Sequence, residues 1–120
     1  MKKLFFFFCF IGIAVNAQTK SLSSNEFNPK KGDLLIDVRT PEEFKEGHLP
    51  NAININYFDS NFAEKINRLP MNKKVYLYCK TGIRSEKAAK VLEKAGFTKT
   101  YVLEGGILAW KAAGKTIKTN

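Results

Sequence analysis

Four short runs along the chain are almost wholly apolar, which is typical of strands buried on both faces of a sheet. They cover residues 34–38, 52–55, 75–78 and 100–103. The segments between and after them indicate short helices, through capping residues or through apolar positions at helical spacing. These segments cover residues 40–47, 61–69, 85–95 and 107–113. Strands that alternate with helices predict an α/β fold with three layers (α/β/α), in which helices cover both faces of a mainly parallel central sheet.

Two of the predicted helices have clear sequence signals. In the first, Thr40 can cap the helix, Pro41 suits the first helical position, Glu43 completes a capping box and Gly47 ends the helix. In the helix predicted over residues 85–95, small and branched apolar residues share one face while lysines occupy the other. The apolar face consists of Ala88, Ala89, Val91, Leu92 and Ala95.

The residues before the first apolar run are mostly polar. Residues 18–31 contain three serines and Pro29, and they predict a linker with a short helical turn at Asn25–Phe27. We therefore expect a polar N-terminal segment at residues 18–31 and a folded domain at residues 32–120.

The first 17 residues have the plan of a secretory signal peptide. Lys2 and Lys3 form a basic start, residues 4–15 form an apolar run, and Ala17 is a small residue at the expected cleavage point. Because that run is shorter than the roughly 20 residues that cross a bilayer as a helix, an uncleaved membrane anchor is the weaker alternative. We expect an exported mature protein, periplasmic or extracellular, that begins at Gln18 and does not contact the membrane.

Cleavage changes both the cysteine content and the charge. Cys9 lies in the apolar run, so Cys79 becomes the single cysteine and an intramolecular disulfide is excluded. Loss of the two lysines at the start lowers the formal net charge from +9 to +7. The remaining lysines are scattered, which favours a solvated basic surface over a nucleic-acid partner. Such a surface attracts small anions toward a cleft.

Three chemically distinctive segments follow predicted strands, at residues 37–39, 79–85 and 104–106. In an open parallel sheet the ligand site lies beyond the carboxyl ends of the strands. We therefore expect these segments to lie near one another at one edge of the sheet.

The segment from Cys79 to Ser85 reads Cys-Lys-Thr-Gly-Ile-Arg-Ser. If a helix begins near Ser85, the amide groups of this loop can surround the cysteine sulfur, because early helical amides have no partner within the helix. Gly82 gives the backbone freedom that a tight loop needs, and Lys80 and Arg84 add positive charge. Such a site favours a thiolate without a general base. A buried core cysteine is the simpler alternative.

Four motifs of the chain, in this order, resemble those of a single-domain rhodanese. They are LIDVRTPEEF at 35–44, GHLPNAINI at 47–55, YCKTGIRS at 78–85 and EGGILAW at 104–110. The resemblance covers roughly residues 27–113. It implies a parallel sheet between helices and the transfer of a sulfane sulfur through a persulfide on Cys79.

The resemblance also implies roles for the loop. Cys79 would be the catalytic nucleophile, taking the outer sulfur of thiosulfate or a related small anionic donor and passing it to a thiol or to cyanide. The substrate-binding residues would be Lys80, Thr81, Gly82, Ile83, Arg84 and Ser85. A protein persulfide could also be a partner. The resemblance implies no cofactor and no metal.

Other residues of the motifs have supporting roles. Asp37 and Arg39 either lie behind the loop at the mouth of the site or form a local salt bridge at the end of a strand. We expect His48 to have a structural hydrogen-bonding role, residues 105–106 to let the backbone pass close to the loop, and Trp110 to pack in the core.

Three functions are consistent with these features. The first is an exported thiosulfate-type sulfurtransferase, and the second is a persulfide carrier or sulfur-sensing module without turnover. The third is a phosphatase or arsenate reductase. The related cell-cycle phosphatases place five residues between cysteine and arginine, whereas four separate Cys79 from Arg84, and a shorter loop suits a sulfur atom better than a tetrahedral phosphate. A redox Cys-x-x-Cys motif is excluded because Gly82 occupies its second cysteine position.

Overall fold

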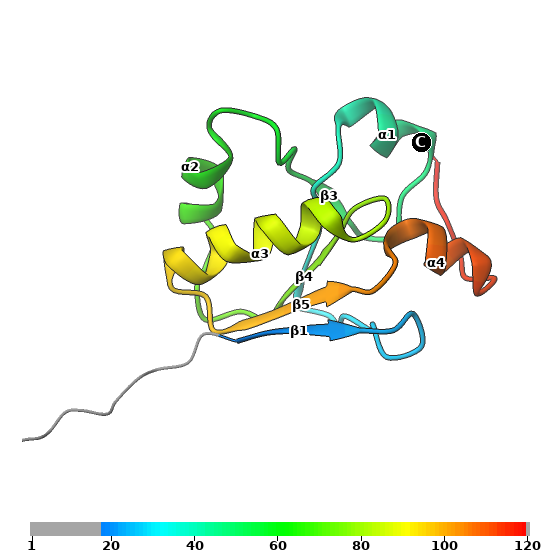
Figure 1. The fold of residues 1–120 in the computed structure, drawn as a ribbon, viewed down its shortest axis with the longest axis horizontal. Coiled ribbons are helices and arrows are strands. Elements are labelled where there is room, and N and C mark those ends of the chain that lie inside the picture. The colour runs from blue at the N-terminus through cyan, green and yellow to red at the C-terminus, as the bar shows by residue number, and fades with distance from the viewer. Residues whose placement is uncertain (1–17, 120) are drawn as a thin grey trace, which may run out of the picture.

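The computed structural model describes residues 18–119, so the predicted signal peptide lies outside the described residues. A five-stranded parallel sheet with the strand order β1-β5-β4-β2-β3 forms its centre (Figure 1). The strands are β1 (Gln18–Leu22), β2 (Leu34–Asp37), β3 (Ile53–Asn54), β4 (Val75–Tyr78) and β5 (Lys99–Leu103). The helices are α1 (Pro41–Glu46), α2 (Phe62–Asn67), α3 (Ile83–Ala95) and α4 (Gly106–Ala112).

The buried side chains form two groups, one on each face of the sheet. Successive residues of β4 alternate between them, as the pleat of a strand requires. Val75 and Leu77 pack with apolar residues of α2 and α3, whereas Tyr76 and Tyr78 pack with Ile107 of α4 on the opposite face. This arrangement confirms the predicted α/β fold with helices on both faces of a parallel sheet. No helix among residues 18–119 is long and apolar enough to cross a membrane.

The four strands and four helices predicted from the sequence are all present, with some changes in their bounds. The capping box of Thr40 and Glu43 forms at the start of α1, and Pro41 occupies the first turn. Strand β3 has only two residues, and α3 begins at Ile83 rather than near Ser85.

The prediction of a linker at residues 18–31 is wrong for its first five residues. Residues 18–22 form β1, an edge strand that pairs with β5 from Gln18 opposite Lys99 to Leu22 opposite Leu103. Beyond a turn at residues 24–26, Phe27 is only 2% exposed. An edge strand has one paired side and one open side, so it tolerates the polar side chains that suggested a linker.

Candidate active site

Cys79 follows β4, the middle strand of the sheet, and immediately precedes the loop that leads into α3. All four residues of β4 are buried, and Cys79 itself is 1% exposed. Neighbouring β2 and β5 end at the same edge of the sheet, as expected for parallel strands. The fold therefore brings the residues that follow three strands toward the cysteine.

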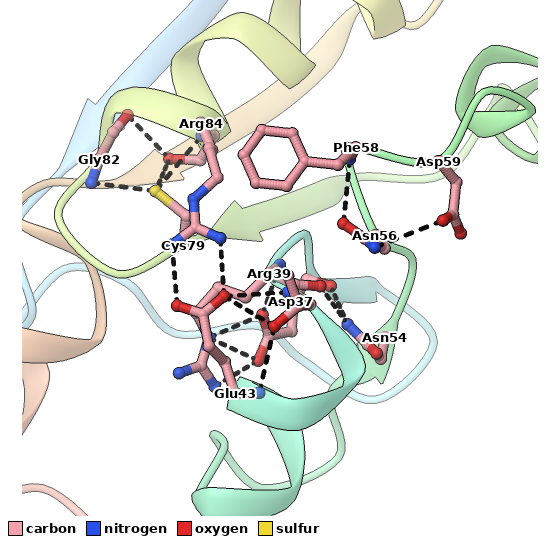
Figure 2. A network of polar contacts seen from close by, with 12 residues as sticks. Asp37, Arg39, Glu43, Asn54, Asn56, Phe58, Asp59, Cys79, Gly82 and Arg84 are labelled. Carbon is pink, nitrogen blue, oxygen red and sulfur yellow. Dashed lines mark hydrogen bonds and ion pairs between the residues drawn. The ribbon is translucent and has the colours of Figure 1, made fainter.

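Two backbone amides point at the cysteine sulfur (Figure 2). The amide of Gly82 donates to Sγ of Cys79 at 3.0 Å, and the amide of Ser85 donates at 3.4 Å. The Ser85 hydroxyl lies 3.5 Å from the same sulfur and donates to the carbonyl of Gly82 at 3.0 Å. A sulfur with two amide donors is stabilised when it carries negative charge. The loop thus holds a core cysteine in a site suited to an anion.

The sulfur takes the place of a side-chain cap at the start of α3. Ser85 occupies the third position of this helix, where a capping side chain normally accepts the backbone amide. The capping residue is Gly82, which has no side chain to do so and which adopts a left-handed conformation with φ 116°. The Cys79 sulfur accepts the Ser85 amide instead. The contact that caps the start of α3 is therefore the same contact that stabilises the cysteine sulfur.

The turn before α4 supports the loop from the other side. The amide of Ile107 donates to the carbonyl of Cys79 at 2.9 Å, and the amide of Leu108 donates to the carbonyl of Lys80 at 3.2 Å. Gly106 has φ +62°, and a Cβ at this position would collide with the carbonyl of Lys80. This contact confirms that residues 105–106 let the backbone pass close to the loop.

Arg84 binds Glu43 of α1 rather than the cysteine sulfur (Figure 2). Its two terminal nitrogens reach the two carboxylate oxygens at 2.7 and 3.0 Å. This bidentate pair lowers the pKa of Glu43 from 4.5 to about 2 and raises the pKa of Arg84. The guanidinium also lies over the ring of Phe58, 5.6 Å from its centroid. The positive charge that the sequence led us to expect beside the sulfur is therefore largely compensated.

The other predicted substrate-binding residues divide into two groups. Gly82 and Ser85 are buried against the sulfur, whereas Lys80, Thr81 and Ile83 have exposed side chains. Sequence reasoning assigned Glu43 to the helix cap alone and missed its contact with Arg84. The two residues are separated by 41 positions, so only the fold relates them.

Asp37 and Arg39 form a buried ion pair at the end of β2. The shortest contact is 2.7 Å, and the side chains are 0% and 6% exposed. Arg39 also donates to the carbonyl of Gly47 at 2.6 Å, and Asn54 donates to the backbone carbonyls of both residues of the pair. Within residues 18–119, neither side chain is hydrogen-bonded to Cys79. The local salt bridge is therefore the better description of these two residues.

His48 and Trp110 have structural contacts. Nδ1 of His48 lies 2.9 Å from the carbonyl of Phe44, whose ring stacks on the imidazole at 3.8 Å between centroids. This confirms the predicted structural hydrogen-bonding role. Trp110 packs edge-on against Phe27 at 6.3 Å, but it is only partly buried and covers the edge of the core rather than lying within it. No group of His, Cys, Asp or Glu suited to a metal ion occurs in the described part of the chain.

Comparison with known proteins gives a consistent picture. The sequence model for the rhodanese-like domain matches residues 19–113. Uncharacterized protein YqhL of Bacillus subtilis is 42% identical over 93 residues, which cover 76% of this chain and 71% of YqhL. Putative sulfurtransferase YtwF of the same organism is 41% identical over 81 residues, which cover 68% of this chain and 76% of YtwF.

A solved structure and a longer relative extend the comparison. The crystal structure of a rhodanese-related protein from Thermoplasma volcanium superposes with a TM-score of 0.74 at 31% identity, covering 84% of this chain and 99% of that chain. The probable adenylyltransferase/sulfurtransferase MoeZ of Mycobacterium tuberculosis is 43% identical over 76 residues. The match covers 63% of this chain but only 19% of MoeZ.

Proposed function

The chain belongs to the family of rhodanese-like domains, and on this premise we propose that it is a sulfurtransferase that carries a sulfane sulfur as a persulfide on Cys79. The observation that supports this proposal best is the pair of amide donors at the cysteine sulfur, from Gly82 at 3.0 Å and Ser85 at 3.4 Å. These donors stabilise the anionic forms of the nucleophile and of the persulfide. The donor is thiosulfate or a related sulfane-sulfur compound.

The reaction has two half-reactions that share one covalent intermediate. In the first, the Cys79 thiolate attacks the outer sulfur of thiosulfate, a sulfur–sulfur bond forms on the cysteine, and the bond within thiosulfate breaks with release of sulfite. In the second, a thiol or cyanide attacks the terminal sulfur of the persulfide and releases the thiolate. No external oxidant or reductant is required. This sequence predicts ping-pong kinetics.

A cyanolysis assay tests the proposal. The wild-type protein is expected to form thiocyanate from cyanide and a sulfur donor, and Cys79→Ala is expected to abolish the reaction because the sulfur has no other carrier. Intact mass after incubation with the donor alone should increase by one sulfur atom in the wild type and stay unchanged in the variant. Equal turnover by Cys79→Ala would reject the mechanism. Circular dichroism controls for loss of fold.

A persulfide carrier is the second candidate, because the same domain forms a small part of a longer relative, MoeZ. A carrier accepts sulfur from one protein and passes it to another. Stable addition of one sulfur with very slow release to every small acceptor would favour the carrier over the enzyme. A phosphatase or arsenate reductase is less well supported, because four residues rather than five separate Cys79 from Arg84.

Export is a further part of the proposal. The predicted cleavage point after Ala17 lies directly before β1, which begins at Gln18. Cleavage there would leave the edge strand intact. The expected result is a mature N-terminus at Gln18 in protein purified from the periplasm or medium, measured by intact mass. Full-length protein retained in the cytoplasm would reject export.

A further inference from the structure

The first turn of α3, which follows the Cys79 loop, carries a compensated positive charge. Arg84 and Glu43 form a bidentate pair whose side chains are 19% and 26% exposed. Glu43 is itself fixed, because one of its oxygens also accepts from the amide and the hydroxyl of Thr40 at 3.0 and 3.1 Å. The hydrogen bond to Glu43 is the largest of the effects that raise the pKa of Arg84. The arginine is thus near the cysteine but neutralised by the carboxylate.

The remaining groups around the loop carry little further positive charge. Lys80 is exposed, and no ion pair joins it to a carboxylate of residues 18–119. Phe58, Ile83 and Leu108 are exposed apolar residues beside the loop, with 64%, 65% and 46% of their surface accessible. Phe58 lies against Arg84, Ile83 is the first residue of α3, and the amide of Leu108 donates to the carbonyl of Lys80 in the loop. One uncompensated lysine and an apolar border suit an organic monoanion better than a small dianion.

We propose that Glu43 is a specificity-determining residue that neutralises Arg84 and thereby favours monoanionic thiol persulfides over dianionic thiosulfate as sulfur donors to Cys79. The inference rests on the proposed sulfurtransferase function and names the donor class for the same site. Its physical basis is the interaction of the donor with the fixed carboxylate. A dianion near Glu43 is repelled about twice as strongly as a monoanion at the same distance.

The transfer step with this donor is simple. The Cys79 thiolate attacks the terminal sulfur of a thiol persulfide, R–S–S⁻. A sulfur–sulfur bond forms on Cys79, the original bond breaks, and the electron pair leaves with R–S⁻, which takes a proton from water. Net charge is conserved on transfer, and the organic group R can contact exposed apolar side chains such as Phe58 or Ile83.

The test uses Glu43→Gln and two donors. Glutamine also completes a capping box, so the substitution removes the charge while retaining the acceptor for Thr40. The donors are thiosulfate and the persulfide of 2-mercaptoethanol, which carries a single negative charge, and the readout is the single-turnover rate of sulfur addition to Cys79 by intact mass. We expect the variant to accept thiosulfate about tenfold faster, because Arg84 is released from its carboxylate. The rate with the persulfide of 2-mercaptoethanol should change less than about threefold.

Glu42→Gln is the matched control, since Glu42 is the neighbouring exposed carboxylate on α1 and makes no ion pair within the described residues. It should leave the ratio of the two rates unchanged. In the double variant Glu43→Gln/Arg84→Ala, the gain with thiosulfate should disappear if it depends on the released arginine. Circular dichroism confirms that each variant is folded.

The outcomes separate this inference from the proposed function. An equal change with both donors, or no change with either, would overturn the role of Glu43 while leaving sulfur transfer in place. A gain with thiosulfate that persists without Arg84 would also overturn it. Failure of the wild-type protein to take sulfur from either donor would reject both proposals.

Discussion

The molecule contains two arginine–carboxylate pairs that are built alike but placed differently. Arg39 binds Asp37 and lies over the ring of Tyr78 at 5.7 Å, while Arg84 binds Glu43 and lies over the ring of Phe58 at 5.6 Å. The first pair is almost fully buried, with exposures of 6% and 0%, whereas the second is 19% and 26% exposed. Burial makes the difference, because removing one partner of a buried pair leaves an uncompensated buried charge, whereas the remaining partner of an exposed pair is solvated by water.

The two pairs also differ in what they connect. Asp37 and Arg39 are two residues apart, and their contacts with Gly47 and Asn54 fix the segment between β2 and β3. Glu43 and Arg84 join α1 to the start of α3, across 41 residues. The buried pair therefore supports the end of β2, while the partly exposed pair compensates the positive charge in the first turn of α3.

The largest expected effect comes from matched carboxylate-to-amide changes in the two pairs. Asp37→Asn leaves the buried Arg39 without its counter-charge and is expected to lower the free energy of unfolding by about 3 kcal/mol. Glu43→Gln should lower it by less than about 1 kcal/mol, because its pair is partly solvated. Urea denaturation of the two variants measures the difference. Similar losses would contradict the distinction between the pairs.

The sequence predicted the parts of the site that depend on residues close together along the chain. The β4–loop–α3 unit, the capping box at Thr40 and the close passage of residues 105–106 follow from residue types at short spacing, and all three are present. For Asp37 and Arg39, the sequence left two roles open, because spacing alone cannot say whether adjacent charges pair with each other or face a ligand.

The parts that the sequence did not predict depend on long-range contacts. Strand β1 is stabilised by pairing with β5, about 80 residues away, and its polar side chains resemble those of a loop. The Glu43–Arg84 pair likewise forms only once α1 and α3 are packed in place. We expected the guanidinium of Arg84 to lie toward the cysteine sulfur. Instead, it binds the carboxylate of Glu43.

The change in stability at acid pH gives a separate test of the partly exposed pair, Glu43 and Arg84. The folded-state pKa of Glu43 is about 2, below its ordinary value of 4.5. The stabilisation from its ionised form is therefore fully present above about pH 4.5 and is lost as the pH falls toward 2. The difference in unfolding free energy between wild type and Glu43→Gln should shrink over this range. Thermal unfolding at several pH values measures it, with Glu42→Gln as the control. A difference independent of pH would show that the carboxylate charge contributes nothing.

The smallest expected effect concerns the aromatic ring beside the partly exposed pair. Phe58 is 64% exposed, so Phe58→Leu removes a solvated cation–π contact and should lower the free energy of unfolding by about 0.5 kcal/mol. Leucine keeps an apolar side chain at the border of the site but cannot attract the guanidinium through a ring face. The two carboxylate contacts of Arg84 should hold it in place, so the preference between thiosulfate and the persulfide of 2-mercaptoethanol should change less than about twofold. A change in preference as large as that of Glu43→Gln would show that the ring, and not the carboxylate, positions Arg84.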